Sequence, residues 1–283
     1  MIKPLKIVAP FVISLSLIFL TSCQNGQDPE ELLMRQYEEN MEEDPYQADY
    51  DILDKGPEAG GTLNMFATKP DSLNPILTKN RYVSDFLGFI YEGLIRLDEK
   101  QQAEPMLSDS WSVSADGLIW NFHIRDGVKW HDGQTFTASD VEFTIQTLMN
   151  PAIDSGYKPL LTNIATCAAV DSSNIRLVLK KPNSFTPEMM TFPILQKEQF
   201  RQKDFLTASG SLKPVGTGPY KFVSYDADKR VILKSNTDWW YLNVEDNAAK
   251  DGMYIETINV NIYSKPDDVL EAFQTGDIDV VGV

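Results

Sequence analysis

The sequence predicts a mixed α/β (α+β) fold, in which short strands and amphipathic helices share one core. Trp120, Phe122 and Ile124 alternate with polar residues, which is the period of a strand with one buried face. Elsewhere apolar residues recur at intervals of three and four positions, as in a helix that is buried along one side. Asp-Gly pairs, which are typical of tight turns, separate several of these segments. Chains that combine both kinds of element in this way form mixed α/β domains.

Three helices are predicted in chain order. The first rests on four apolar residues at helical spacing, Val83, Phe86, Leu87 and Ile90. Gly93 is placed to end this helix. The second begins at Thr137 and Asp140, which have the spacing of a capping box and can satisfy free backbone N–H groups. The third lies around residues 269–273 and ends at Gly276.

The strands are predicted from alternating apolar residues between turn signals. They are expected at residues 62–66, 120–124, 175–179, 231–233, 255–262 and 278–283. Together with the helices they form a globular body over residues 59–283, with a subdomain expected at about residues 94–195.

The first 22 residues have the features of a secretory leader. Two lysines precede an apolar run from Ile7 to Leu20, which is shorter than the roughly 20 residues needed to cross a bilayer. The run ends in Leu20-Thr21-Ser22-Cys23, which resembles a bacterial lipobox. We therefore predict cleavage after residue 22 and lipidation of Cys23, which would hold the protein on the membrane. The alternative is a single-pass anchor with a chance cysteine.

Cys23 and the residues up to 58 are predicted to form a lipidated, acidic tether. Residues 28–54 hold eleven acids and one base, and they lack periodic apolar residues. A partner-binding acidic tail is the alternative. Removing this −10 and the two lysines before Cys23 from the total of −16 leaves −8 for residues 55–283. Such a charge argues against a nucleic-acid partner, which would need a basic surface.

The sequence contains no motif of a known catalytic or metal site, so we expect no enzyme activity, no catalytic residues, no metal and no cofactor. His123 is expected on the polar face of a strand, and His131 is interpreted as a solvated histidine of a turn beside Asp132. Cys167 lies in an apolar stretch and is expected to be a buried small residue.

A long run of residues resembles a known family. Its pieces are Leu107-Ser108-Asp109-Ser110-Trp111, Asp116-Gly117-Leu118-Ile119-Trp120, Ile124-Arg125-Asp126-Gly127-Val128-Lys129-Trp130-His131-Asp132-Gly133 and Phe136-Thr137-Ala138-Ser139-Asp140-Val141. Flanking pieces agree in order: Asp71-Ser72-Leu73-Asn74-Pro75, Tyr91-Glu92-Gly93-Leu94, Pro214-Val215-Gly216-Thr217-Gly218-Pro219-Tyr220 and Gly276-Asp277-Ile278-Asp279. The chain thus resembles the extracellular solute-binding proteins of family 5, the oligopeptide-, dipeptide- and nickel-binding components of ABC importers.

The resemblance implies a lobe of the periplasmic-binding-protein-like type II fold. Members of the family close two lobes over a ligand, and this chain is expected to hold the N-terminal part of the first lobe, incomplete and without the second. The implied partners are a peptide ligand and the permease and ATPase subunits of an ABC transporter. The protein is expected to act as a monomer, anchored through Cys23 to the outer face of the cytoplasmic membrane or in the periplasm.

The resemblance also indicates candidate ligand-binding residues. In the family, the segment after Asn74-Pro75 contributes to the cleft, which gives Thr78, Lys79, Asn80, Arg81 and Tyr82. The second set lies where the chain returns to the main lobe, and comprises Gly216, Thr217, Gly218 and Tyr220. The alternative for the first set is a group of ordinary exposed loop residues, and for the glycines of the second set a role in a turn.

Function therefore has one leading hypothesis and two alternatives. The leading one is transport of a peptide as the substrate-binding component of an ABC importer, with nickel chelates, haem or sugars as other ligands. The first alternative is a lipid-anchored surface signalling or scaffold protein that keeps the fold without transport. The second is a lipid-anchored hydrolase that depends on His131 or Asp132.

Overall fold

The computed structural model describes residues 58–201, 212–227, 229–244 and 253–281. The chain divides into two compact units, Met1–Glu58 and Ala59–Val283, and the elements below all belong to the second. The predicted leader, Cys23 and the acidic tether up to residue 57 lie outside the described residues.

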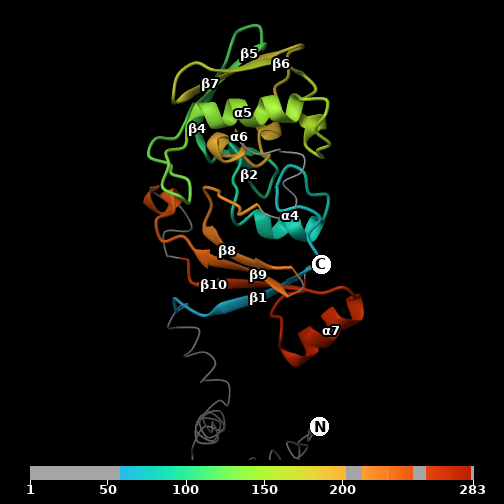
Figure 1. Ribbon diagram of the computed structural model, residues 1–283. Coiled ribbons are helices and arrows are strands. Elements are labelled where there is room, and N and C mark those ends of the chain that lie inside the picture. The colour runs from blue at the N-terminus through green and yellow to red at the C-terminus, as the bar shows by residue number, and fades with distance from the viewer. Residues whose placement is uncertain (1–57, 202–211, 228, 245–252, 282–283) are drawn as a thin grey trace, which may run out of the picture. The chain divides into compact units, whose positions relative to one another are not determined.

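One four-stranded sheet joins the two ends of this unit. Its order is β1 (Thr62–Ala67), β10 (Thr257–Ile262), β9 (Arg230–Ser235) and β8 (Tyr220–Asp226). β1 and β10 run parallel, while β10, β9 and β8 are antiparallel neighbours (Figure 1). β1 is the first described strand and β10 the last. All the other described strands therefore lie between these two paired strands in the sequence.

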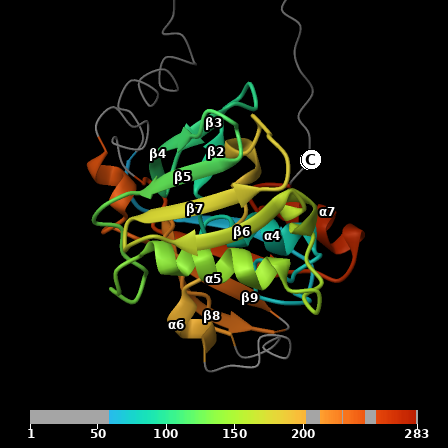
Figure 2. The ribbon, with the colours of Figure 1, turned by 90° about the horizontal axis from the view of Figure 1, so that it is seen from above.

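A second four-stranded sheet is wholly antiparallel and lies above one helix. Its order is β4 (Ser108–Val113), β5 (Ile119–Ile124), β7 (Asn174–Leu179) and β6 (Ile164–Ala169). Figures 1 and 2 show α5 (Ala138–Met149) lying under this sheet. Trp120, Phe122 and Ile124 of β5 are buried, which confirms the predicted alternation.

The remaining elements are mostly shorter. They are α4 (Arg81–Leu87), the hairpin β2 (Ile95–Leu97) and β3 (Ala103–Pro105), the 3-10 turns Lys158–Leu161, Pro187–Met189 and Trp240–Asn243, α6 (Lys197–Arg201) and α7 (Pro266–Thr275). α7 packs Val269 and Ala272 on Ile278, Phe66 and Tyr263 at the carboxyl ends of β1 and β10, apart from the main core.

The predicted capping box opens α5. The Asp140 carboxylate accepts a hydrogen bond from the Thr137 backbone N–H at 3.0 Å, and it also accepts one from the Lys197 N–H at 2.9 Å. α5 then buries one face of Val141, Ile145 and Leu148 against the sheet. The predicted helix is therefore confirmed, and its cap also anchors the start of α6.

Two predicted elements differ from the structure. α4 ends at Leu87 rather than near Gly93, because the Phe89 and Ile90 carbonyls accept hydrogen bonds from Tyr220 and Gly218 instead of continuing a helix. The predicted strand from Ile278 is absent over the described residues 278–281. There the Asp279 carboxylate accepts the Asn64 N–H at 2.7 Å, in the place where a strand would offer a backbone carbonyl.

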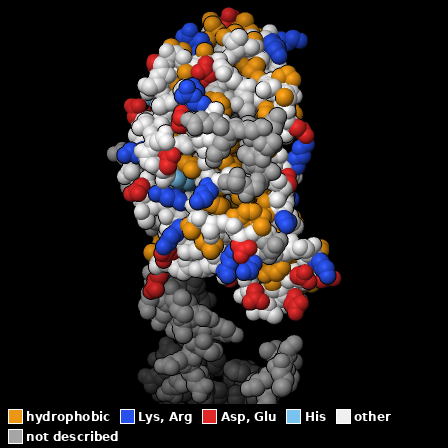
Figure 3. Space-filling model, in the orientation of Figure 1, with side chains coloured by type: hydrophobic (Ala, Val, Ile, Leu, Met, Phe, Trp, Pro, Cys, Tyr) orange, Lys and Arg blue, Asp and Glu red, His pale blue; other side chains and the backbone are white. Residues whose placement is uncertain are grey.

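Charges of both signs are interspersed on the face of the molecule shown in Figure 3. This face therefore lacks the continuous basic stripe that binding to phosphate backbones requires. Within the described residues, no helix combines the length and the apolar character required of a membrane span.

A buried carboxylate links the segments between the two sheets. Glu92 is fully enclosed and accepts hydrogen bonds from the Thr217 hydroxyl at 2.6 Å and from the Trp239 and Trp240 indole N–H groups at 2.9 Å each. Burial raises the pKa of Glu92, and these three hydrogen bonds oppose that shift. Three donors surround the side chain, so an acceptor-only carboxylate fits the site.

Replacing Glu92 by Gln should lower the free energy of unfolding by about 2–4 kcal/mol. A glutamine has nearly the same shape, but one of its two terminal groups is a donor that faces another donor. Urea unfolding followed by tryptophan fluorescence measures the loss. Glu99→Gln, at an exposed position, is the matched control and should change stability by less than about 0.5 kcal/mol. Equal effects of the two replacements would contradict the role of Glu92.

Candidate functional site

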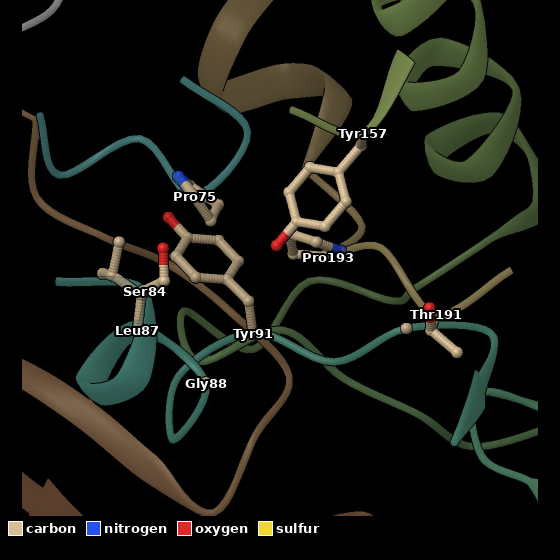
Figure 4. A pocket seen from close by; sticks show the side chains of 9 residues that line it. Pro75, Ser84, Leu87, Gly88, Tyr91, Tyr157, Thr191 and Pro193 are labelled. Atoms are coloured by element: carbon tan, nitrogen blue, oxygen red, sulfur yellow. The ribbon is translucent and has the colours of Figure 1, made fainter. Parts of the chain in front are cut away.

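A pocket of about 130 Å³ lies beside α4, between segments that are distant in the sequence. We call it the tyrosine pocket, after Tyr91 and Tyr157, which reach into it from opposite sides (Figure 4). The remaining lining residues are Pro75, Ser84, Leu87, Gly88, Gly93, Thr191 and Pro193. Pro75 and Ser84 thus flank the predicted segment Thr78–Tyr82 in the sequence, but no residue of that segment lines the tyrosine pocket.

The absence of a side chain at Gly93 brings two walls of the tyrosine pocket together. A Cβ at this position would lie 2.8 Å from the Thr191 carbonyl oxygen, so only glycine allows this approach. The Ile194 N–H donates to the Glu92 carbonyl at 2.9 Å, and the Ile95 N–H donates to the Met190 carbonyl at 3.2 Å. These backbone hydrogen bonds fix Thr191 beside Tyr91.

The tyrosine pocket offers neutral hydroxyl groups. The Tyr91 side chain is buried, and its hydroxyl has no hydrogen-bond partner of normal geometry among the described residues. Burial raises the pKa of Tyr91, and a weak interaction with the Val215 backbone opposes this only in part. Burial also raises the pKa of Tyr157. Both phenols therefore stay protonated at neutral pH and can donate a hydrogen bond to a ligand.

The predicted segment Thr78–Tyr82 lies between the tyrosine pocket and a second pocket. Asp71 holds its first residues, because its carboxylate accepts the Thr78 hydroxyl at 2.5 Å and the Lys79 N–H at 2.8 Å. Burial alone would raise the pKa of Asp71, but these hydrogen bonds outweigh it and the pKa is lowered. The Lys79 ammonium pairs with Asp154, which connects this segment to the loop before Tyr157.

Asn80 and Tyr82 have different roles in this segment. The Asn80 side chain caps α4 by accepting the Tyr82 N–H at 3.1 Å, and its amide donates to the Thr68 hydroxyl at 2.7 Å. Arg81 is exposed at the first turn of α4. Tyr82 is 39% exposed and packs on Phe66, with ring centroids 4.9 Å apart. Tyr82 thus presents a partly exposed aromatic ring, and a ligand role for the segment stays a prediction.

The second pocket, which we call the strand-end pocket, has a volume of about 250 Å³ and lies at the carboxyl ends of β1 and β10. Phe66, Tyr82 and Tyr263 line it together with residues at the start of α7. Ligands often bind at the carboxyl ends of parallel strands in open α/β sheets. Tyr82 belongs to the strand-end pocket, and Pro75 and Ser84, close to it in the sequence, belong to the tyrosine pocket.

The second predicted set is buried behind the tyrosine pocket. Gly216 packs so tightly on the chain that a Cβ would lie 1.8 Å from the Ile90 carbonyl oxygen. The Gly218 and Tyr220 N–H groups donate to the Ile90 and Phe89 carbonyls at 2.9 Å each. Thr217 is 1% exposed, and its hydroxyl is bonded to Glu92. These residues hold the segment that carries Tyr91, while direct contact with a ligand stays a prediction.

The interpretation of His131 as a solvated turn histidine is wrong. Its Nε2 donates to the Gly218 carbonyl at 2.9 Å, and its Nδ1 accepts the Gly216 N–H at 3.3 Å, so the ring is neutral. Burial lowers the pKa of His131 to about 4, because a charged imidazole would lose solvation. Asp132 accepts hydrogen bonds from Gln134 and Gln196. Both ring nitrogens are thus engaged with the backbone, which leaves neither available as the base of a hydrolase.

Two other titratable side chains, those of His123 and Cys167, have structural surroundings. His123 lies on the polar face of β5 as predicted, with its Nδ1 2.8 Å from an Asp109 carboxylate oxygen. Cys167 is half-buried on β6, and burial raises the pKa of its thiol to about 12. In the part of the chain that the structure describes, no three His, Cys, Asp or Glu residues gather as metal ligands would.

Sequence reasoning missed the tyrosines that define the pocket. Tyr91 lies in one of the segments that resemble the family. The sequence did not indicate, however, whether Tyr91 or its neighbour Glu92 faces the pocket. Tyr157 and Thr191 lie outside any motif or periodic segment. Only the close packing at Gly93 and the ion pair of Lys79 reveal that these residues converge.

Comparison with known proteins matches this chain to a family of binding proteins. Residues 102–283 match the family profile described as Bacterial extracellular solute-binding proteins, family 5 Middle. The oligopeptide-binding protein OppA of Bacillus subtilis is 26% identical over 243 residues, which cover 78% of this chain and 43% of that protein. The chain therefore spans less than half the length of this relative.

Solved structures show the same fold. NikZ from Campylobacter jejuni, in complex with Ni(L-His), superposes with a TM-score of 0.65 and 27% identity over 77% of this chain and 42% of that one. DppA from Helicobacter pylori, in complex with the peptide STSA, gives a TM-score of 0.61 and 26% identity over 80% and 47%. The prediction of a type II periplasmic-binding-protein-like fold is confirmed over the residues that these structures cover.

The neutral His131 makes stability depend on pH. Its folded pKa of about 4 lies below the ordinary value of 6.5, so the unfolded chain binds more protons between these values. The free energy of unfolding should be highest above pH 6.5 from this group and fall by roughly 3 kcal/mol as the pH drops to 4. Thermal unfolding at a series of pH values measures the slope.

His131→Asn keeps an acceptor for the Gly216 N–H but cannot titrate, so this variant should lose most of the slope between pH 6.5 and 4. His123→Asn makes the same replacement at the other histidine and serves as the control. Glu92 and Asp140 have raised pKa values and act in the opposite direction as the pH falls, but they are common to all three proteins. An unchanged slope in His131→Asn would contradict the assignment.

Proposed function

This chain belongs to family 5 of the bacterial extracellular solute-binding proteins, and we propose that it captures a peptide outside the cytoplasm for an ABC importer. The observation that carries the proposal is the tyrosine pocket, whose wall combines apolar surface with the hydroxyl groups of Ser84, Tyr91, Tyr157 and Thr191. Such hydroxyl groups can hydrogen-bond the carbonyl and amide groups of a peptide. The family consists of binding proteins rather than enzymes.

The relatives support a peptide as the ligand. OppA is described as an oligopeptide-binding protein, and the DppA structure contains the peptide STSA. In the proposed mechanism the described lobe offers Tyr91 and Tyr157 as hydrogen-bonding groups, with Ser84 and Thr191 on the wall. A second lobe would close over the peptide by a hinge motion and complete the contacts. Delivery to a permease and its ATPase would follow, as in other importers of this kind.

The predicted segment contributes to the strand-end pocket rather than to the tyrosine pocket. Tyr82 lines the strand-end pocket and Arg81 is exposed at the first turn of α4, whereas Thr78, Lys79 and Asn80 hold the segment in place. Gly216, Thr217, Gly218 and Tyr220 act from behind by fixing Phe89 and Ile90. We propose that Tyr82 and Arg81 meet the ligand and that the set from Gly216 to Tyr220 positions Tyr91.

Peptide binding should be detectable with this chain alone, although weak. Trialanine should give saturation-transfer NMR signals with a Kd on the order of 1 mM, which corresponds to about −4 kcal/mol. Ser84→Leu fills the pocket from α4 and should reduce the signal several-fold, whereas Ser112→Leu, on the exposed end of β4, should not. No transfer to trialanine, or equal signals in the two variants, would contradict the proposal.

The anchor is proposed to be the lipid on Cys23, with the acidic residues up to 58 as a spacer. Cells that express the gene and are fed an alkyne fatty acid should label the wild-type protein, and the label should fractionate with membranes. Cys23→Ser should abolish the label, whereas Cys167→Ser, the control at the half-buried thiol, should keep it. Membrane association of an unlabelled protein would favour a single-pass anchor instead.

A further inference from the structure

We infer that the tyrosine pocket selects an uncharged aromatic or branched aliphatic side chain of the ligand and rejects carboxylates and cations. This inference rests on the proposed function, in that the side chain belongs to a bound peptide. It goes further by assigning to Tyr91 and Tyr157 the choice among peptides. Three features of the pocket support this inference. They are its size, the neutrality of its wall and the partners that hold Glu92, Lys79 and Asp154.

The size of the tyrosine pocket fits one side chain. Its volume is about 130 Å³. An engineered protein cavity of about 150 Å³ binds benzene, so this pocket holds a group of roughly that size. Pro75, Leu87 and Pro193 supply apolar wall, and the two tyrosine rings supply flat surfaces across from each other (Figure 4). An aromatic ring or a leucine-sized group matches this space, whereas a second large group does not fit beside it.

The wall of the pocket carries no charged side chain. Every lining residue is neutral, and the polar groups among the lining side chains are the hydroxyls of Ser84, Tyr91, Tyr157 and Thr191. A carboxylate or ammonium placed here would lose water without gaining an opposite charge, which is costly. Hydroxyl groups can satisfy the hydrogen bonds of a neutral carbonyl or phenol, whereas for an ion they do not offset the much larger cost of desolvation.

Charged groups close to Tyr91 and Tyr157 in the sequence are engaged with other partners. Glu92 follows Tyr91 in the sequence, but its carboxylate is enclosed by Thr217, Trp239 and Trp240. Lys79 and Asp154 pair with each other at the surface, with side chains 62% and 84% exposed. Neither Glu92 nor the Lys79–Asp154 pair presents a free charge to the pocket. The selection of neutral side chains therefore follows from where these ions are held, as well as from what lines the wall.

The test uses three small probes that differ in one side chain: the N-acetyl amides of phenylalanine, glutamate and lysine. Ligand-observed NMR with the whole chain should give the phenylalanine probe a Kd at least about tenfold lower than either charged probe. Ser84→Leu, which fills the pocket from α4, should weaken binding of the phenylalanine probe about fivefold, because it removes the space for the ring. Ser84 is half-buried, so the fold should survive this change.

Ser112→Leu makes the same replacement on the exposed end of β4 and is the matched control. It should leave the affinity for the phenylalanine probe unchanged. Equal affinity for the three probes, or loss of binding in Ser112→Leu rather than in Ser84→Leu, would overturn the inference. Selective binding of the phenylalanine probe without any binding of trialanine would support the pocket's selectivity and reject the peptide function. Binding of trialanine with no selectivity among the probes would do the reverse.

Discussion

The rest of the described lobe depends on the hydrogen bonds around one buried carboxylate. Glu92 receives donors from Thr217 and from two adjacent tryptophans, and so ties together three segments that are far apart in the sequence. A buried carboxylate is costly unless it is compensated, and here three donors compensate it. Because the partners come from separate segments, the network forms only when all of them have docked. Arg125 stacks on Trp240 with its guanidinium 5.0 Å from the ring centroid, which extends this junction to the end of β5.

The tyrosine pocket is a consequence of that junction. The segment from Phe89 to Gly93 is pinned on one side by Gly218 and Tyr220 and on the other by Ile194. Glu92 faces the interior network, whereas the adjacent Tyr91 lines the pocket. The same arrangement removes the negative charge of Glu92 from the pocket wall. Fold stability and the character of the pocket wall are thus coupled through two adjacent residues.

Backbone contact also explains why His131 is structural. The imidazole bridges the Gly216 N–H and the Gly218 carbonyl. The absence of a side chain at Gly216 lets the segment that contains both glycines approach Ile90. A histidine beside an aspartate in a turn suggested solvent exposure, and nothing local in the sequence indicated a partner so far along the chain. The ring replaces hydrogen bonds that a turn would otherwise make to water, and this requires its neutral form.

The sequence by itself determined the mixed α/β class, five of the ten described strands, the start of α5 and the end of α7, because each depends on local periodicity, caps and turns. Alternation in β5 and the Thr137–Asp140 box needed no tertiary information. The family resemblance indicated the segment Thr78–Tyr82, of which no residue lines the tyrosine pocket. Tertiary structure decided the early end of α4, the fate of residues 278–281 and the convergence of Tyr91, Tyr157 and Thr191. These outcomes rest on hydrogen bonds and close packing between residues distant in the sequence, which leave no periodic signal in the chain.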